Sequence, residues 1–281
     1  HEALESDAVI VARQADAVVM VLGLTARLEG EEMPVAIEGF RGGDRTRIDL
    51  PAAQQRLLER ISALGKPVVL VLLNGSALSV NWAQDHVPAI VEGWYPGQAG
   101  GSALADVLFG DYNPAGRLPV TFYRDTTDLP AFNNYNMAGR TYRYFAGTPL
   151  YPFGHGLSYT HFAYSRLRTS APSLRANRSV NVSVDVTNTG ARGGDEVVQL
   201  YARHLGSSVT RASRDLRGFR RITLAPGQRR TVTFALPASS LAYWNEATHR
   251  WTVEADAIAL EVGASSADIR VTKNLKVTAA R

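Results

Sequence analysis

Continuous apolar runs mark the first part of the chain. Residues 17–22 and 67–73 are apolar throughout, and a third strand is predicted over residues 89–94. Runs of this length without a polar alternation are typical of parallel strands that are buried on both faces. Helical patterns separate the runs, so this part of the sequence predicts a mostly parallel α/β sandwich.

The helices are predicted from apolar spacing and from their end signals. From about Ala52, four apolar residues fall on one helical face, and Gly65-Lys66-Pro67 ends the pattern. These four residues are Leu57, Leu58, Ile61 and Leu64. Further helices are predicted over residues 1–14, 82–86 and 100–109.

From about Ser165 the apolar period changes to two. Four valines alternate with polar residues and are followed by a turn signal at Asn188, Thr189 and Gly190. The valines are Val180, Val182, Val184 and Val186. Further short strands are predicted over residues 197–201, 220–224, 231–236, 251–253 and 258–262. Short strands at this spacing predict an all-β sandwich.

A segment rich in Tyr, Phe, Asn, Gly and Pro separates the two patterns. It covers residues 126–165 and carries too many aromatic side chains for a flexible linker, because such rings need a surface to pack against. We therefore expect an α/β-sandwich domain over residues 1–125, an ordered connection over 126–165 and a β-sandwich over 166–281.

Charge and composition narrow the classes of function. Residues 1–165 carry 12 Lys and Arg against 17 Asp and Glu, whereas residues 166–281 carry 18 against 9, so the formal charges are −5 and +9. No nucleic-acid motif accompanies the basic half, and we expect no nucleic-acid partner. The chain has no cysteine, which excludes disulfides. No apolar stretch reaches the roughly 18 residues of a membrane span, so no membrane partner is expected.

The candidate chemistry lies in the loop that follows the first buried strand. Functional groups of open α/β sheets lie in loops beyond the carboxyl ends of the strands. Glu29, Glu31 and Glu32 crowd into four positions there, and their mutual repulsion favours keeping one of them protonated, as a general acid requires. A solvated acidic loop is the alternative, and spacing alone does not exclude it.

Other candidates are weaker. The glycine-rich turn at residues 95–101 matches neither the phosphate-loop nor the dinucleotide fingerprint, so a tight strand-to-helix turn is favoured. His155 lies between two glycines and is expected to be structural. The sequence predicts no metal site and no cofactor.

Several short motifs occur in a fixed order along the chain. The first domain contains Glu29-Gly30-Glu31-Glu32-Met33, Gly42-Gly43-Asp44-Arg45, Leu73-Asn74-Gly75 and Trp94-Tyr95-Pro96-Gly97. Beyond them lie Gly110-Asp111-Tyr112-Asn113-Pro114-Ala115-Gly116-Arg117-Leu118-Pro119 and Tyr151-Pro152-Phe153-Gly154-His155-Gly156-Leu157-Ser158-Tyr159. The last domain contains Gln199-Leu200-Tyr201 and Leu216-Arg217-Gly218-Phe219. Together these motifs resemble the carboxyl-terminal two-thirds of glycoside hydrolase family 3, whose last module is fibronectin type III-like.

The resemblance implies a retaining exo-β-glycosidase, which needs two carboxylates about 5–5.5 Å apart. In the family the nucleophile is an Asp on an amino-terminal (β/α)8 barrel, and no stretch of this chain resembles that barrel. The general acid/base is a Glu on the loop after a strand of the α/β-sandwich domain. Matched to the family motif, that residue is Glu31, with Asp44-Arg45 as the Asp-Arg pair that follows. Extra residues precede Asp44 in this chain, so Glu32, and after it Glu29 and Glu38, stay alternatives.

The acidic loop and the segment Arg140-Thr141-Tyr142-Arg143-Tyr144-Phe145 resemble the β-xylosidase branch of the family more than typical β-glucosidases. We therefore expect a β-D-xylosidase that acts on terminal sugars of oligosaccharides or on aryl β-glycosides, with a β-glucosidase as the alternative. A non-catalytic carbohydrate-binding or scaffolding protein with the same domains is a further alternative.

The resemblance also bears on partners and location. The amino-terminal barrel of the same enzyme is the expected partner, and without it we expect the chain to be inactive. The family's habit indicates a periplasmic or secreted protein. The first residues show no signal peptide and predict a helix already under way, so we expect the chain to be the later part of a longer protein. Homodimer formation stays open.

Overall fold

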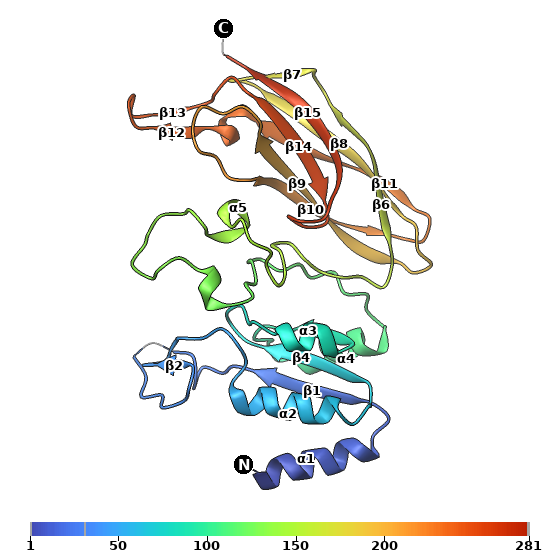
Figure 1. Cartoon of the computed structure of the whole chain (residues 1–281). Coiled ribbons are helices and arrows are strands. Elements are labelled where there is room, and N and C mark those ends of the chain that lie inside the picture. Colours follow the sequence, from blue (N-terminus) through green and yellow to red (C-terminus); the bar gives the residue numbers. More distant parts are fainter. Residues whose placement is uncertain (1, 31, 280–281) are drawn as a thin grey trace. The chain divides into compact units, whose positions relative to one another are not determined.

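The computed structural model describes residues 2–30 and 32–279, which form two compact units (Figure 1). The first unit contains the residues up to Phe109 together with Phe122–Asn134 and Gly147–Tyr151. The second contains Gly110–Thr121, Tyr135–Ala146 and the residues from Pro152 onward. The domain boundaries expected at residues 125 and 165 stay a prediction.

Three parallel strands form the centre of the first unit. They are β1 (Val18–Gly23), β4 (Val68–Leu73) and β5 (Ala89–Glu92), in the order β1-β4-β5. The central strand β4 is the most buried of them, with Leu70 and Val71 fully inside. Its unbroken apolar sequence is thus explained by cover on both faces.

Helices alternate with these strands, which confirms the predicted α/β class. They are α1 (Glu2–Gln14), α2 (Ala52–Ser62), α3 (Asn81–His86) and α4 (Gly100–Phe109). α2 begins directly after Pro51 and buries Leu58 and Ile61. An ion pair of 2.7 Å between Arg60 Nη1 and Glu5 Oε2 joins α2 to α1, its neighbour in Figure 1. His1, the first residue of the predicted helix, lies outside the described residues.

An aromatic cluster closes the first unit. The ring of Phe122 is 1% exposed and makes edge contacts with Trp94 and Tyr151, at centroid distances of 6.0 and 5.9 Å. Backbone hydrogen bonds also join Phe122 to Tyr151. A short 3-10 helix, η1 (Thr126–Asp128), follows and is capped by Asp125.

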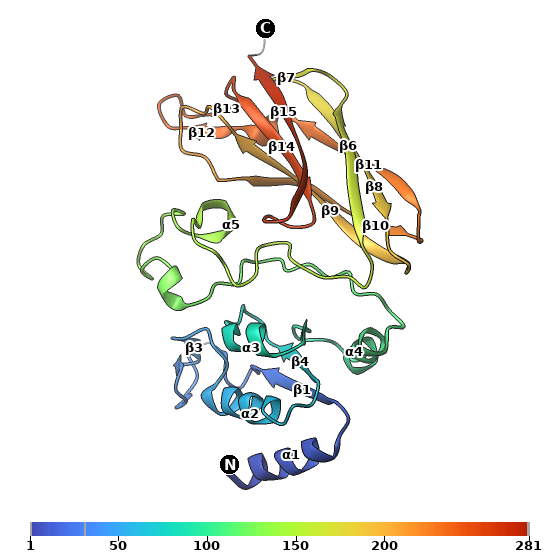
Figure 2. The same cartoon turned by 45° about the vertical axis from the view of Figure 1, so that its right-hand side comes forward.

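The second unit is the predicted β-sandwich (Figure 2). One sheet has the order β10-β9-β14-β15-β7, and the other has the order β11-β8-β6. β15 and β7 pair in parallel, and the other neighbouring strands of these sheets pair in antiparallel fashion. The first sheet consists of β7 (Ser173–Arg175), β9 (Gly194–His204), β10 (Asp215–Leu224), β14 (Ala257–Gly263) and β15 (Ile269–Thr278). The second consists of β6 (Phe162–Thr169), β8 (Ser179–Asn188) and β11 (Arg229–Pro237).

The core of the sandwich lies between these two sheets. The four alternating valines of β8 are at most 1% exposed and contact apolar residues of both sheets, as their period predicts. Smaller elements complete the unit: α5 (Thr141–Tyr144), η2 (Ala238–Leu241) and the hairpin of β12 (Tyr243–Asn245) with β13 (Arg250–Thr252).

The segment that follows α4 belongs to the second unit through polar contacts. Asn113 accepts hydrogen bonds from the backbone N–H of Tyr159 (2.8 Å) and from the Ser158 hydroxyl (3.0 Å). Arg117 forms a buried ion pair of 2.8 Å with Glu196 on β9. Among the described residues, no helix is long and apolar enough to cross a membrane.

Candidate functional site

The candidate site lies at the carboxyl edge of the sheet β1-β4-β5. Three loops meet there: the acidic loop of residues 24–49 after β1, the turn of residues 74–80 after β4, and the turn of residues 93–99 after β5. Parallel strands place all three loops at the same edge, which is where open α/β sheets carry their functional groups.

Gln54 on α2 fixes the start of the acidic loop. Its side-chain oxygen accepts the N–H of Gly23 at 2.8 Å, and its side-chain nitrogen donates to the carbonyl of Gly23 at 2.8 Å. Gly23 has a φ of 135°, and a Cβ atom there would lie 2.0 Å from the Leu73 carbonyl oxygen. Only glycine fits this close approach of β1 to β4, so the loop leaves the sheet at a defined point.

The returning limb of the loop is a tight hairpin. β2 (Phe40–Arg41) and β3 (Asp44–Arg45) pair in antiparallel fashion around Gly42 and Gly43, whose φ angles are 62° and 90°. Two central residues with positive φ are what a two-residue hairpin favours, and Gly-Gly meets that need. This hairpin was not predicted from the sequence, which had shown only a glycine-rich closure.

The two limbs of the loop touch beside the acidic motif. The backbone of Gly43 approaches Gly30 so closely that a Cβ atom on Gly43 would lie 1.7 Å from the Gly30 carbonyl oxygen. The N–H of Met33 donates to the carbonyl of Gly42 at 2.7 Å. Described residues on both sides of position 31 are therefore held against the hairpin.

A polar chain ties both limbs to the end of β4. Arg45 Nη1 donates to the Ser76 hydroxyl and to the Ala77 carbonyl, each at 2.8 Å, and the Ser76 hydroxyl donates to a carboxylate oxygen of Glu29. Burial lowers the pKa of Arg45, and the carboxylates of Glu29 and Asp49 act in the opposite direction. We call Glu29, Ser76 and Arg45 the loop brace.

The candidate glutamates differ in their contacts. Glu29 is held in the loop brace, and Glu38, with a side chain 77% exposed, forms an ion pair of 2.9 Å with Arg47. Glu32 is exposed and has a φ of 50°, an uncommon backbone conformation for a residue with a side chain. Glu31, the first choice from the sequence, lies outside the described residues, so its role stays a prediction.

Glu92 is a site residue that sequence reasoning missed. Its half-buried carboxylate, at the end of β5, accepts the N–H of Trp94 at 3.0 Å and an N–H of the Asn74 side chain at 3.3 Å. Burial raises the pKa of Glu92 to about 7, against the lowering effect of these two hydrogen bonds. The available signal was a lone carboxylate at the end of an apolar strand.

Tyr95 lies on the same edge and faces the turn after β4. A Cβ atom on Gly75 would lie 2.8 Å from Cε2 of the Tyr95 ring, so glycine lets the ring cover that turn. Burial and the nearby Glu29 carboxylate raise the pKa of the Tyr95 hydroxyl. The ring remains 52% exposed and belongs to the surface of the site.

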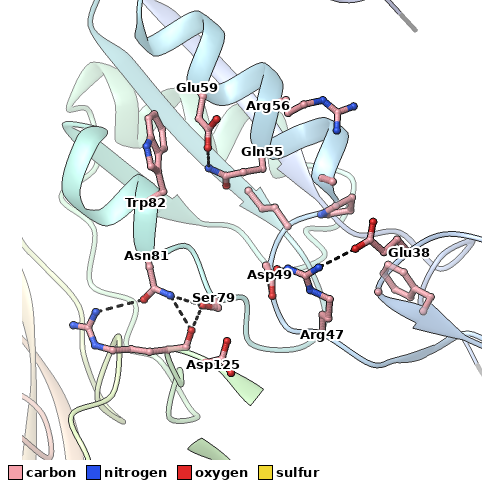
Figure 3. A pocket seen from close by; sticks show the side chains of 16 residues that line it. Glu38, Arg47, Asp49, Gln55, Arg56, Glu59, Ser79, Asn81, Trp82 and Asp125 are labelled. Atoms are coloured by element: carbon pink, nitrogen blue, oxygen red, sulfur yellow. Dashed lines mark hydrogen bonds and ion pairs between the residues drawn. The ribbon is translucent and has the colours of Figure 1, made fainter. Parts of the chain in front are cut away.

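A polar cavity of about 390 Å³ lies beside the returning limb (Figure 3). It is lined by that limb, by α2 and α3, and by residues 124–125. The carboxylates in its wall are engaged in local contacts: Glu38 and Asp49 with Arg47, Glu59 with Gln55, and Asp125 with the N–H of Thr127. These contacts indicate a structural role for the carboxylates of the cavity wall. The described residues contain no group of His, Asp or Glu side chains suited to hold a metal ion.

Two family models match the chain. The glycosyl hydrolase family 3 C-terminal domain matches residues 2–159, and a fibronectin type III-like domain matches residues 196–266.

Individual relatives agree with these matches. The chain is 44% identical to a xylan 1,4-β-xylosidase of Xylanibacter ruminicola, covering 93% of the chain and 30% of the relative. It is 40% identical to a periplasmic β-glucosidase of Salmonella typhimurium, covering 96% of the chain and 35% of the relative. The crystal structure of a β-glucosidase from Bifidobacterium adolescentis superposes with a TM-score of 0.87 at 35% identity, over 99% of the chain and 41% of that structure.

The chain thus spans about a third of the length of the curated relatives it matches, so the expectation that it corresponds to two-thirds of a family member is wrong. Its α/β sandwich, its β-sandwich and the order of its motifs agree with the two family models. The chain therefore belongs to glycoside hydrolase family 3 and corresponds to the carboxyl-terminal portion of its members.

Proposed function

We propose that this chain supplies the general acid/base of a retaining exo-β-glycosidase. The observation that carries the proposal is the acidic loop at the carboxyl edge of β1-β4-β5, held by the loop brace in a member of this hydrolase family. A retaining enzyme uses one carboxylate as nucleophile and a second to protonate the leaving oxygen and later to deprotonate water. The nucleophile is expected on the amino-terminal barrel, outside this chain.

Glu31 is the proposed acid/base, with Glu32 as the alternative. The contacts of the other two candidates support this choice, because the Glu29 carboxylate accepts the Ser76 hydroxyl and Glu38 is paired with Arg47. A carboxylate already held by such partners is poorly placed to deliver a proton to a sugar oxygen. The residues next to position 31, Gly30 and Glu32, lie in the part of the loop pinned by the hairpin.

The proposed substrates are terminal, non-reducing β-linked sugars, with β-xylosides favoured. The similarity to a xylan 1,4-β-xylosidase supports this preference, and a second relative is named β-xylosidase, from Formosa agariphila, at 42% identity. A β-glucosidase is the second candidate, because relatives with that name reach 40% identity. The periplasmic β-glucosidase among these relatives supports a periplasmic or secreted location.

The experiment that tests the proposal uses the full-length protein and aryl β-xylosides and β-glucosides. Replacing Glu31 by Gln or Ala should lower kcat/KM by at least about 100-fold for a phenyl glycoside, whose leaving group needs a proton. The dinitrophenolate leaving group departs without protonation, so kcat/KM for a dinitrophenyl glycoside should change little. Release of the sugar needs the base, so kcat of Glu31→Ala on the dinitrophenyl substrate should fall even though kcat/KM does not. Azide should restore this kcat, since azide replaces base-activated water in releasing the sugar.

Glu32→Gln and Glu38→Gln serve as matched controls for charge removal in the same loop. A loss at Glu32 that depends on the leaving group, without one at Glu31, would transfer the role to Glu32. If neither Glu31→Gln nor Glu32→Gln showed an effect that depends on the leaving group, the acid/base would be another residue of the protein.

A further inference from the structure

The Ser76 hydroxyl is shared between the two limbs of the acidic loop. It accepts a hydrogen bond from Arg45, on the returning hairpin, and donates one to Glu29, on the outgoing limb. A serine hydroxyl offers one donor and two acceptor positions, so it serves a cation and an anion at once. Ser76 lies 47 positions from Glu29 and 31 from Arg45 along the chain, and the fold brings the three together.

The backbone that carries Ser76 is itself fixed. Asn74 is fully buried, and its side-chain nitrogen donates to the Ser76 carbonyl at 2.9 Å and to the Glu92 carboxylate at 3.3 Å. Glu92 in turn accepts the N–H of Trp94, so the chain of hydrogen bonds extends to the end of β5. These hydrogen bonds hold Ser76 at the sheet edge, and its hydroxyl in turn holds the acidic loop.

The position of this contact along the loop matters for the chemistry. Glu29 precedes position 31 by two residues, and Arg45 ends the hairpin whose Gly43 approaches the Gly30 carbonyl. Charge-assisted hydrogen bonds such as those of Arg45 and Glu29 are stronger than neutral ones. A displacement of about 1 Å at a catalytic group costs about 100-fold in rate, so such bonds are suited to hold an acid/base in register.

We propose that Ser76 is a positioning residue for the general acid/base, acting through Glu29 and Arg45. This inference rests on the proposed function, in which Glu31 protonates the leaving group. In this role Ser76 acts on the loop through Glu29 and Arg45, its hydrogen-bond partners, and not on the sugar. Its removal unties the outgoing limb and the hairpin from the end of β4, and the proton donor loses its place relative to the glycosidic oxygen.

The test compares Ser76→Ala with Ser76→Thr in the full-length protein. Ser76→Ala should lower kcat/KM for the phenyl glycoside about 10- to 100-fold and leave kcat/KM for the dinitrophenyl glycoside nearly unchanged. Ser76→Thr keeps the hydroxyl and should recover most of the loss. Ser79→Ala is the matched control, since the Ser79 hydroxyl donates to the Arg124 carbonyl and does not contact the loop brace.

A merely structural role predicts a different pattern. If Ser76→Ala lowered kcat/KM equally for both leaving groups, or no more than Ser79→Ala does, the positioning role would be overturned while Glu31 kept its assignment. If Glu31→Gln showed no dependence on the leaving group, the proposed function would fail, and this inference with it. Ser76→Ala thus tests the positioning role, and Glu31→Gln tests the proposed function.

Discussion

The carboxyl group of Glu92 sits where ionisation is costly. It is half-buried at the end of β5, and burial raises its pKa from the ordinary 4.5 to about 7. Below about pH 4.5 it is protonated in the folded and the unfolded chain alike, and above about pH 7 it is ionised in both. Between these values only the folded chain keeps the proton, so the stability of the first unit falls as pH rises from about 4.5 to about 7.

Replacing Glu92 by Gln should remove this pH dependence. Glutamine keeps an acceptor for the Trp94 N–H and carries no charge, but it loses the acceptor for the Asn74 side chain at every pH. The stability of the variant relative to the natural protein should therefore be about 2 kcal/mol more favourable at pH 8 than at pH 4. Hydrogen exchange of the β5 amides at both pH values measures this in the first unit alone. Glu59→Gln, on the exposed face of α2, is the control. An equal stability difference at both pH values would contradict the prediction.

At the scale of elements, the β2–β3 hairpin shapes the acidic loop. Gly43→Ala should disrupt it, because φ is 90° there and the new Cβ atom would lie 1.7 Å from the Gly30 carbonyl oxygen. We expect a loss of at least about 100-fold in kcat/KM for a phenyl glycoside in the full-length protein. Gly42→Ala is a closely matched control: φ is 62° and nothing lies within 4 Å, so it should cost about 1 kcal/mol of stability and little activity. Equal effects of the two variants would disprove the pinning role of Gly43.

The same scale shows what the sequence pattern could predict. β1 and β4 were predicted within one residue of their observed bounds. Burial on both faces explains the apolar run of β4. The same burial was expected for β1 and is wrong there, because Val19 and Val21 are 51% and 54% exposed. β15 was missed, because half of its side chains are exposed and its apolar positions do not repeat regularly. β10 was predicted only from residue 220, whereas it begins at Asp215 and has an irregular register between Leu216 and Gly218.

The sequence predicted the candidate chemistry in the loop after β1, and this stays a prediction; the contacts of that loop could not be predicted. Glu29 and Glu38 were alternatives for the acid/base because neighbouring carboxylates look alike in a sequence. The contacts that distinguish them are those of Glu29 with Ser76 and of Glu38 with Arg47. Ser76 lies 47 positions from Glu29 along the chain. Such pairings arise from the register of parallel strands, and no local pattern encodes them. The role of Ser76 therefore became visible only once β1 and β4 lay side by side.

At the scale of the whole molecule, the proposed function assigns the two carboxylates of a retaining glycosidase to different parts of the full-length protein. The chain spans 30% of its xylosidase relative, and its proposed contribution is the acid/base alone. We expect the 281-residue chain, assayed by itself, to show no turnover of dinitrophenyl β-xyloside or β-glucoside above the uncatalysed rate, since an activated leaving group still needs a nucleophile. The full-length protein at equal concentration is the positive control. If the 281-residue chain turned over phenyl as well as dinitrophenyl glycosides, and Glu31→Gln left both rates unchanged, both the nucleophile and the acid/base would have been assigned wrongly. Turnover that Glu31→Gln slows only for phenyl glycosides would keep the acid/base and place the nucleophile among these 281 residues.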